Sequence, residues 1–77
     1  MTGITIGERL REARLAKNKT IKEMSALLRI TDRAYRNYEY DAREPNLHIL
    51  KQICIYLDVS ADYIIGIDMY KERNGLT

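Results

Sequence analysis

The chain has 77 residues, and its composition excludes several classes of protein before any motif is considered. A chain of this length forms one small domain, without the deep, walled pocket that most enzymes use. The single cysteine, Cys54, excludes a disulfide framework and a cysteine-based zinc site. No apolar run approaches the roughly 18–20 residues of a membrane span, and the first residues lack a signal-peptide pattern. We therefore expect a cytoplasmic chain with no membrane partner.

Charge is distributed unevenly along the chain. The net charge is only +2, which is too small to indicate a polyanionic partner by itself. Residues 1–43 carry ten basic and six acidic groups and net +4, whereas residues 44–77 carry three basic and five acidic groups and net −2. This asymmetry favours one surface for phosphate and another for a different partner. The alternative is that these charges only solvate helix surfaces.

Capping patterns predict two short helices in the first part of the chain. The sequence Thr5–Glu8 fits a capping box, so a first helix begins at Ile6 and ends near Asn18. The sequence Thr20–Glu23 is a second capping box, which opens an amphipathic helix ending at Leu28. Neither apolar stripe is long enough to be stable alone, so both helices must pack on others.

Three further helices follow, each after a residue that caps helix N-termini well. They cover residues 32–40 after Thr31, 47–57 after Asn46, and 61–65 after Ser60, with Gly66 as the stop. The chain is therefore predicted to be all-α, with five helices around one core. We expect one domain over residues 1–66 and a C-terminal tail over residues 67–77, which is a candidate dimer contact.

The second and third helices have helix-turn-helix spacing. In the DNA-binding use of this motif, the third helix lies in the major groove and the second crosses the backbone. Arg33, Arg36 and Asn37 would lie on its polar face, where Arg reads guanine and Asn reads adenine through paired hydrogen bonds. The Asp32 carboxylate could accept a hydrogen bond from cytosine N4. The alternative is that its negative charge only stabilises the N-terminus of the third helix. The alternative for the other three is that they are ordinary solvent-facing residues.

Residues 6–66, about four-fifths of the chain, resemble the lambda-repressor-like, Cro/C1-type (XRE) helix-turn-helix domain. The resemblance depends on an ordered set of segments at matching spacing, none of which is specific alone. These segments are Ile6–Arg14, Thr20–Met24, Ile30–Glu39, Arg43–Asn46, Leu50–Leu57 and Val59–Gly66.

The resemblance implies a transcriptional regulator, usually a dimer on a near-palindromic operator and here most simply a repressor. It also implies roles for individual side chains. Arg14 and Glu39 occupy positions that typically form an ion pair between the first helix and the end of the third. The positions for base contact hold Asp32, Arg33, Arg36 and Asn37, with Thr31 beside them. Phosphate contacts are expected from Thr20, Lys22, Thr31 and Arg43. We add Tyr40 to these because its hydroxyl could reach a phosphate, although it could instead only cover the loop.

The chain departs from the family pattern at several positions. The usual Gln at the start of the second helix is Ile21, which cannot hydrogen-bond to a phosphate, and the usual small Ala is Ser25. The usual turn Gly is Arg29, which would be strained by about 1 kcal/mol if its φ is positive. The other departures are Lys19 for leucine, Tyr35 for an aliphatic residue, and Asp41 for glycine.

The apolar residues of the C-terminal third exceed what one small core can absorb. We expect some of them to form a two-fold dimer contact from the fifth helix, the tail and part of the fourth helix. The candidates are Ile55, Tyr56, Ile64, Ile67, Met69 and Tyr70. The alternative is that the tail folds back over its own core.

The sequence favours double-stranded DNA as partner and predicts no enzyme, metal, cofactor or small-molecule ligand. It contains no Ser/His/Asp set and no phosphate-binding glycine loop, and a lone histidine, His48, is no metal site. Cys54 fits a small core position better than a reactive thiol. The competing interpretation is a protein-interaction module, or an antitoxin-like partner protein, that keeps the fold and binds DNA weakly or not at all.

Overall fold

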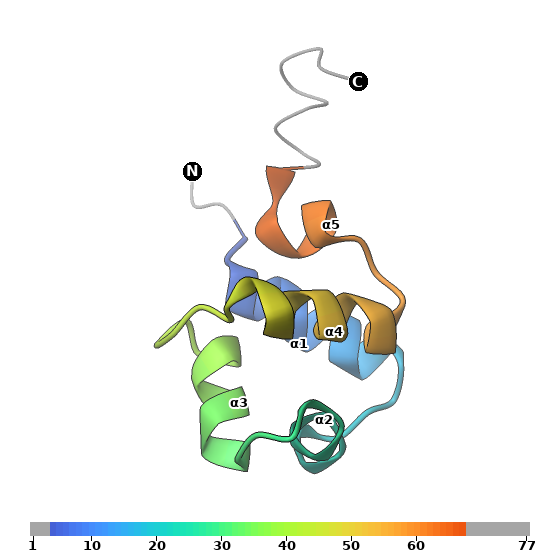
Figure 1. Ribbon diagram of the computed structural model, residues 1–77. Helices are drawn as coiled ribbons and strands as arrows, with labels where there is room; N and C mark the ends of the chain where they lie inside the picture. The colour runs from blue at the N-terminus through green and yellow to red at the C-terminus, as the bar shows by residue number, and fades with distance from the viewer. Residues whose placement is uncertain (1–3, 68–77) are drawn as a thin grey trace.

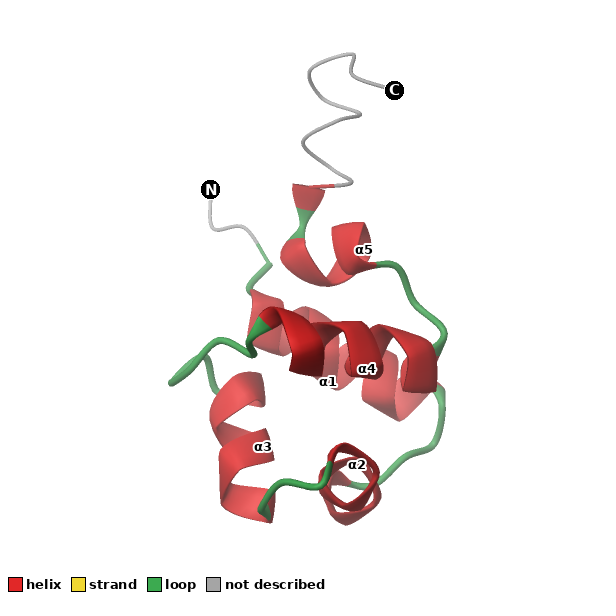
Figure 2. Cartoon of the chain, viewed as in Figure 1, coloured by secondary structure: helices red, strands yellow, loops and turns green. Residues whose placement is uncertain are grey.

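The computed structural model describes residues 4–67, and in that part of the chain every regular element is an α-helix (Figures 1 and 2). The helices are α1 (Ile6–Ala16), α2 (Ile21–Leu28), α3 (Asp32–Glu39), α4 (Leu47–Leu57) and α5 (Ala61–Ile65). The prediction of an all-α, five-helix domain is therefore confirmed. None of these described helices is long and apolar enough to cross a membrane.

Each helix begins at the capping residue that the sequence predicted. The side chain of each cap accepts the backbone N–H three residues further on; the caps are Thr5, Thr20, Thr31, Asn46 and Ser60. The Thr20–Glu23 capping box is complete, because Glu23 also accepts the backbone N–H of Thr20. The Thr5–Glu8 capping box is incomplete. The Glu8 carboxylate accepts a hydrogen bond from the Thr5 hydroxyl and not from the Thr5 backbone N–H.

One core joins all five helices. Its fully buried side chains are Leu10, Met24, Tyr35, Ile53, Leu57 and Ile64. α1 packs against α3 and α5, α2 packs against α3 and α4, and α4 packs against α5. Figure 1 shows α5 at the end of the molecule opposite α2 and α3. Because α2 and α3 lie together at one end, the helix-turn-helix is presented away from α5.

Gly7 lets α1 approach the end of α3 closely. A Cβ atom at this position would lie 2.3 Å from the carbonyl oxygen of Glu39, which is far inside van der Waals contact. The backbone N–H of Gly7 donates to Oδ1 of Asp41 at 2.8 Å. Asp41 has a φ of 61°, so this residue combines a left-handed turn with a bond back to α1.

Candidate nucleic-acid interface

The turn between α2 and α3 forms the hydrogen bond that ends α2, although it lacks the usual glycine. Arg29 is in the left-handed region, with φ 57° and ψ 45°, and ends α2. The next residue, Ile30, donates its backbone N–H to the carbonyl oxygen of Ser25 at 3.0 Å, as in a Schellman-type helix end. The geometry of a glycine turn is therefore kept, at a cost of about 1–2 kcal/mol for a non-glycine residue.

α3 has a buried face that fixes its position and an exposed face that is free to contact a ligand. Tyr35 is fully buried, and its ring meets that of Tyr38 edge to face, with centroids 6.4 Å apart. Burial raises the pKa of the Tyr35 hydroxyl, which stays protonated. On the other side, Arg33 and Arg36 are exposed and Asn37 is half-buried. The three predicted readout residues therefore lie on a helix that the core holds firmly.

Asp32 has a structural partner that the sequence did not predict. Its carboxylate accepts the hydroxyl hydrogen bond of Ser25, and the Ser25 hydroxyl also lies 3.0 Å from the carbonyl oxygen of Lys22. This contact ties the start of α3 to α2. The sequence marks Ser25 only as a departure from the usual alanine, and no local rule pairs residues seven positions apart across a turn.

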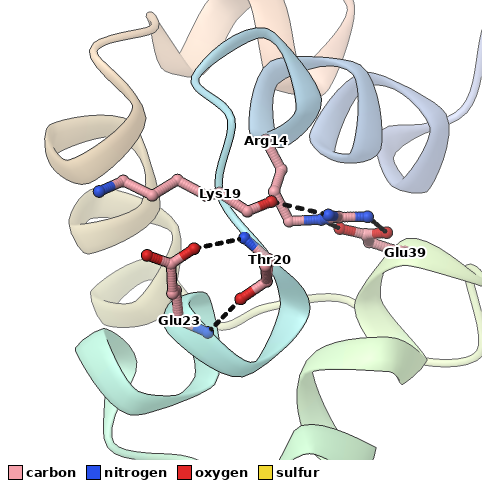
Figure 3. Close-up of polar contacts among 5 residues, drawn as sticks. All are labelled: Arg14, Lys19, Thr20, Glu23 and Glu39. Atoms are coloured by element: carbon pink, nitrogen blue, oxygen red, sulfur yellow. Dashed lines mark hydrogen bonds and ion pairs between the residues drawn. The ribbon is translucent and has the colours of Figure 1, made fainter.

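Arg14 joins three segments of the helix-turn-helix domain (Figure 3). Its Nε donates to Oε2 of Glu39 at 2.6 Å, and its Nη2 donates to Oε1 of the same carboxylate at 3.2 Å. Its Nη1 donates to the backbone carbonyl of Lys19 at 2.9 Å, just before α2. The hydrogen bond to Glu39 raises the pKa of Arg14 above its ordinary value. One buried guanidinium therefore fixes both the entry to α2 and the end of α3 relative to α1.

The two threonines predicted at phosphate contacts are also helix caps. Figure 3 shows Thr20 exchanging hydrogen bonds with Glu23, and its Oγ1 accepts the Glu23 N–H at 3.0 Å. Thr31 accepts the Ala34 N–H at 3.0 Å in the same way. A hydroxyl that accepts from the backbone still has its own proton to donate. Both exposed hydroxyls can therefore cap a helix and donate to an anion at the same time.

The loop after α3 presents two more of the predicted residues. The carbonyl oxygen of Asn37 accepts the backbone N–H of Ala42 at 2.9 Å and that of Arg43 at 3.2 Å. These bonds hold the loop close to the C-terminal end of α3. Tyr40 is 73% exposed and Arg43 is also exposed, so both side chains are available beside α3, as is Lys22 on α2.

The predicted dimer residues do not form one surface. Ile55 and Tyr56 are exposed but line two different grooves, one between α4 and α5 and one between α2 and α4. Ile67 is 37% exposed, whereas Ile64 is fully buried in the core. The assignment of Ile64 to an interface is therefore wrong, because its side chain already contacts the chain's own core. Met69 and Tyr70 lie outside the described residues.

The described residues offer no alternative chemistry based on a metal ion. No group of three or more His, Cys, Asp or Glu side chains is close enough to hold an ion within residues 4–67. His48 is exposed at the start of α4. Cys54 is half-buried, and burial raises the pKa of its thiol, which makes it a poor nucleophile at neutral pH.

Comparison with known proteins agrees with this geometry. A helix-turn-helix family model matches residues 10–64, which span α2, the turn and α3 as well as most of α1 and α5. The chain is 35% identical over 71 residues to the HTH-type transcriptional regulator ImmR of Bacillus subtilis (strain 168), covering 92% of this chain and 56% of that protein.

Two other Bacillus subtilis (strain 168) proteins match over a shorter span. The SPbeta prophage-derived uncharacterized HTH-type transcriptional regulator YonR is 36% identical over 59 residues, which cover 77% of this chain and 55% of that protein. The uncharacterized HTH-type transcriptional regulator YqaE is 41% identical over 58 residues, which cover 75% of this chain and 50% of that protein. The chain thus spans about half the length of these relatives. It belongs to the helix-turn-helix family, in its lambda-repressor-like, Cro/C1-type (XRE) branch.

Proposed function

We propose that this chain is a sequence-specific DNA-binding transcriptional regulator, acting as a repressor, and that α3 reads the major groove of double-stranded DNA. The observation that carries the proposal is the division of α3 into a buried face at Tyr35 and an outward face, where Arg33 and Arg36 are exposed and Asn37 is half-buried. An anchored helix with Arg and Asn side chains on its outward face is suited to hydrogen bonding with base edges. The regulator names of the relatives support the same role. Because its target is DNA, we place the chain in the cytoplasm.

The residues around α3 supply the contacts that set the register on the duplex. Lys22, Tyr40 and Arg43 are exposed beside α3, and the hydroxyls of Thr20 and Thr31 stand at the N-termini of α2 and α3. Helix N-termini and basic side chains both favour phosphate. Asp32 is a weaker candidate for base contact than Arg33, Arg36 and Asn37, because its carboxylate already accepts a hydrogen bond from the Ser25 hydroxyl. Such phosphate contacts would make the affinity fall steeply with salt.

A homodimer completes the proposal. Two copies related by a two-fold axis would place two α3 helices on half-sites about one helical turn apart, which requires an inverted-repeat operator. The exposed apolar side chains of Ile55 on α4 and of Ile67 after α5 support a contact between copies.

The experiment that tests the function is a selection from a random duplex library at about 100 mM salt, followed by binding measurements on variants. Arg33→Ala and Asn37→Ala should each lose about 1–3 kcal/mol at one base position and relax specificity there. Arg43→Ala should weaken binding to all sequences alike. Arg11→Ala is the matched control, because Arg11 is exposed on α1, outside the helix-turn-helix. Equal losses on operator and random DNA for all three variants would contradict the assignment.

One observation favours a second candidate, a protein-interaction module of the antitoxin-like kind. Ile21, the first residue of α2, is half-buried and packs against the core, so its side chain cannot hydrogen-bond to a phosphate. This removes one contact that the family pattern provides. A folded chain that enriches no sequence from the library, and binds DNA negligibly at low salt, would support this second function.

A further inference from the structure

A hydroxyl of α2 holds the first side chain of α3. Asp32 is the first residue of α3, and its carboxylate accepts a hydrogen bond from the Ser25 hydroxyl of α2. Figure 2 shows the loop that joins the end of α2 to the start of α3. Because the hydrogen bond crosses this loop, it fixes the direction of the Asp32 side chain as well as linking the two helices.

The Ser25 hydroxyl lies within hydrogen-bond distance of two acceptors. One is the Asp32 carboxylate, and the other is the carbonyl oxygen of Lys22 at 3.0 Å. A hydroxyl has one proton to donate, and an ionised carboxylate is a stronger acceptor than a neutral carbonyl. The Ser25 proton therefore favours Asp32. The resulting bond is charge-assisted, so it selects one conformation of the Asp32 side chain.

This hydrogen bond draws the Asp32 carboxylate toward α2. Ser25 is only 3% exposed, so its hydroxyl lies below the surface of the domain. Aspartate has a short side chain, and a carboxylate that reaches a buried hydroxyl cannot extend into solvent at the same time. Asp32 is accordingly half-buried, whereas its neighbour Arg33 is exposed. The start of α3 therefore presents a cation outward and keeps its carboxylate against α2.

A free carboxylate at this position would change what α3 reads. The N-terminal residues of a recognition helix are those that contact base edges, and an aspartate there accepts a hydrogen bond from cytosine N4. Its charge would also be repelled by the phosphates of the duplex. Holding Asp32 against α2 removes both effects, while its charge still stabilises the N-terminus of α3. The alanine that is usual at position 25 has no hydroxyl and could not hold the carboxylate.

We propose that Ser25 is a positioning residue for base specificity, because it holds the Asp32 carboxylate off the base edges. Readout then falls to the outward residues of α3, which are Arg33, Arg36 and Asn37. The inference rests on the DNA binding of the proposed function and deepens it. It assigns control of the base preference to a buried hydroxyl of α2 that does not itself contact DNA.

The library selection, repeated with Ser25→Ala, tests this role. Removal of the hydroxyl frees Asp32, so the variant should gain a preference for cytosine at one base pair, by about fivefold or more. Asp32→Ala should abolish this gain in the Ser25→Ala background and should change the preference less in the wild-type background, so the two substitutions are not additive. Ala26→Ser is the matched control, because it adds a hydroxyl at an exposed neighbouring position of α2 and should leave the base preference unchanged.

Two further measurements distinguish positioning from a merely structural role. Alanine is small and favours helix, so Ser25→Ala should remain folded by circular dichroism and thermal melting. In the absence of DNA, NMR coupling constants about χ1 of Asp32 should show one rotamer in the wild type and averaging over several in Ser25→Ala. If Ser25 only stabilised the fold, its loss would weaken binding to all sequences alike and would create no preference at a single base pair.

The outcomes separate this inference from the proposed function. A wild-type chain that selects an operator, together with an unchanged base preference in Ser25→Ala, overturns the role of Ser25 but not sequence-specific binding. An equal effect of Asp32→Ala in both backgrounds overturns it as well, since Asp32 would then read its base while bonded to Ser25. A wild-type chain that enriches no sequence contradicts the proposed function and the specificity role together. The coupling constants test the contact itself, and averaging in the wild type would overturn it without reference to DNA.

Discussion

Removing the carboxylate of Glu39 should destabilise this domain more than any exposed substitution. The side chains of Arg14 and Glu39 are only 9% and 3% exposed, and two hydrogen bonds join them. Glu39→Ala leaves a buried guanidinium that has lost its carboxylate partner, although its Nη1 still donates to the Lys19 carbonyl. Breaking a buried pair in this way costs about 3–5 kcal/mol. At roughly 0.05–0.15 kcal/mol per residue, the whole chain is stable by only about 4–12 kcal/mol, so the variant should lie close to unfolding.

The assay is urea unfolding followed by circular dichroism, on Glu39→Ala, Arg14→Met and the double variant. The double variant should be destabilised by less than the sum of the two single variants, because it buries no unpaired charge. Lys17→Ala is the control, since Lys17 forms an exposed pair with Asp58 at 4.0 Å, and its loss should cost less than about 1 kcal/mol. A loss below about 1 kcal/mol for Glu39→Ala, or strict additivity in the cycle, would refute the reasoning.

Three other substitutions test separate features of the fold. Gly7→Ala should cost about 1–3 kcal/mol in thermal unfolding, because its Cβ would overlap the carbonyl oxygen of Glu39; unchanged stability would contradict the close approach of α1 to α3. Arg29→Gly should add about 0.5–1 kcal/mol by relieving the left-handed φ of 57°, and no gain in urea unfolding would mean that the arginine side chain makes a compensating contact. The Thr20 backbone N–H lowers the pKa of Glu23 below 4.5, so the stability that this carboxylate contributes is present above pH 4.5 and is lost as pH falls through the lowered value. Unfolding of wild type and Glu23→Gln across that range should therefore converge in acid, and a constant difference would contradict the capping role.

Features that depend on neighbouring residues were predictable from the sequence. A threonine that caps a helix acts on an N–H three residues away, so Thr20, Thr31 and Ser60 marked the helix starts correctly. The left-handed turn at Arg29 came from the family pattern, since no local rule places an arginine there. The same holds for the Arg14–Glu39 pair, whose members are 25 residues apart.

Features that depend on which way a short helix faces were less predictable. α5 is five residues long and carries Tyr63, Ile64 and Ile65 in succession, so its sequence has no stripe that separates a buried from an exposed face. The structure buries Ile64 and exposes Ile65, which is why the assignment of Ile64 to a dimer surface was wrong. The Asp32–Ser25 contact was missed because it depends on the angle that the α2–α3 turn imposes.

The arrangement separates the residues that hold the domain together from those proposed to read DNA. Arg14 and Tyr35 fix α3 from its buried side, whereas Arg33 and Arg36 project from the other side and are exposed. Surface substitutions of this kind usually change stability by no more than about 0.5 kcal/mol. Arg33→Gln and Arg36→Gln should therefore change the sequence preference of the library selection while the urea midpoint stays unchanged. A large loss of stability in either variant would show that the exposed face of α3 also supports the fold. The sequence preference for DNA could then not change independently of the stability of the domain.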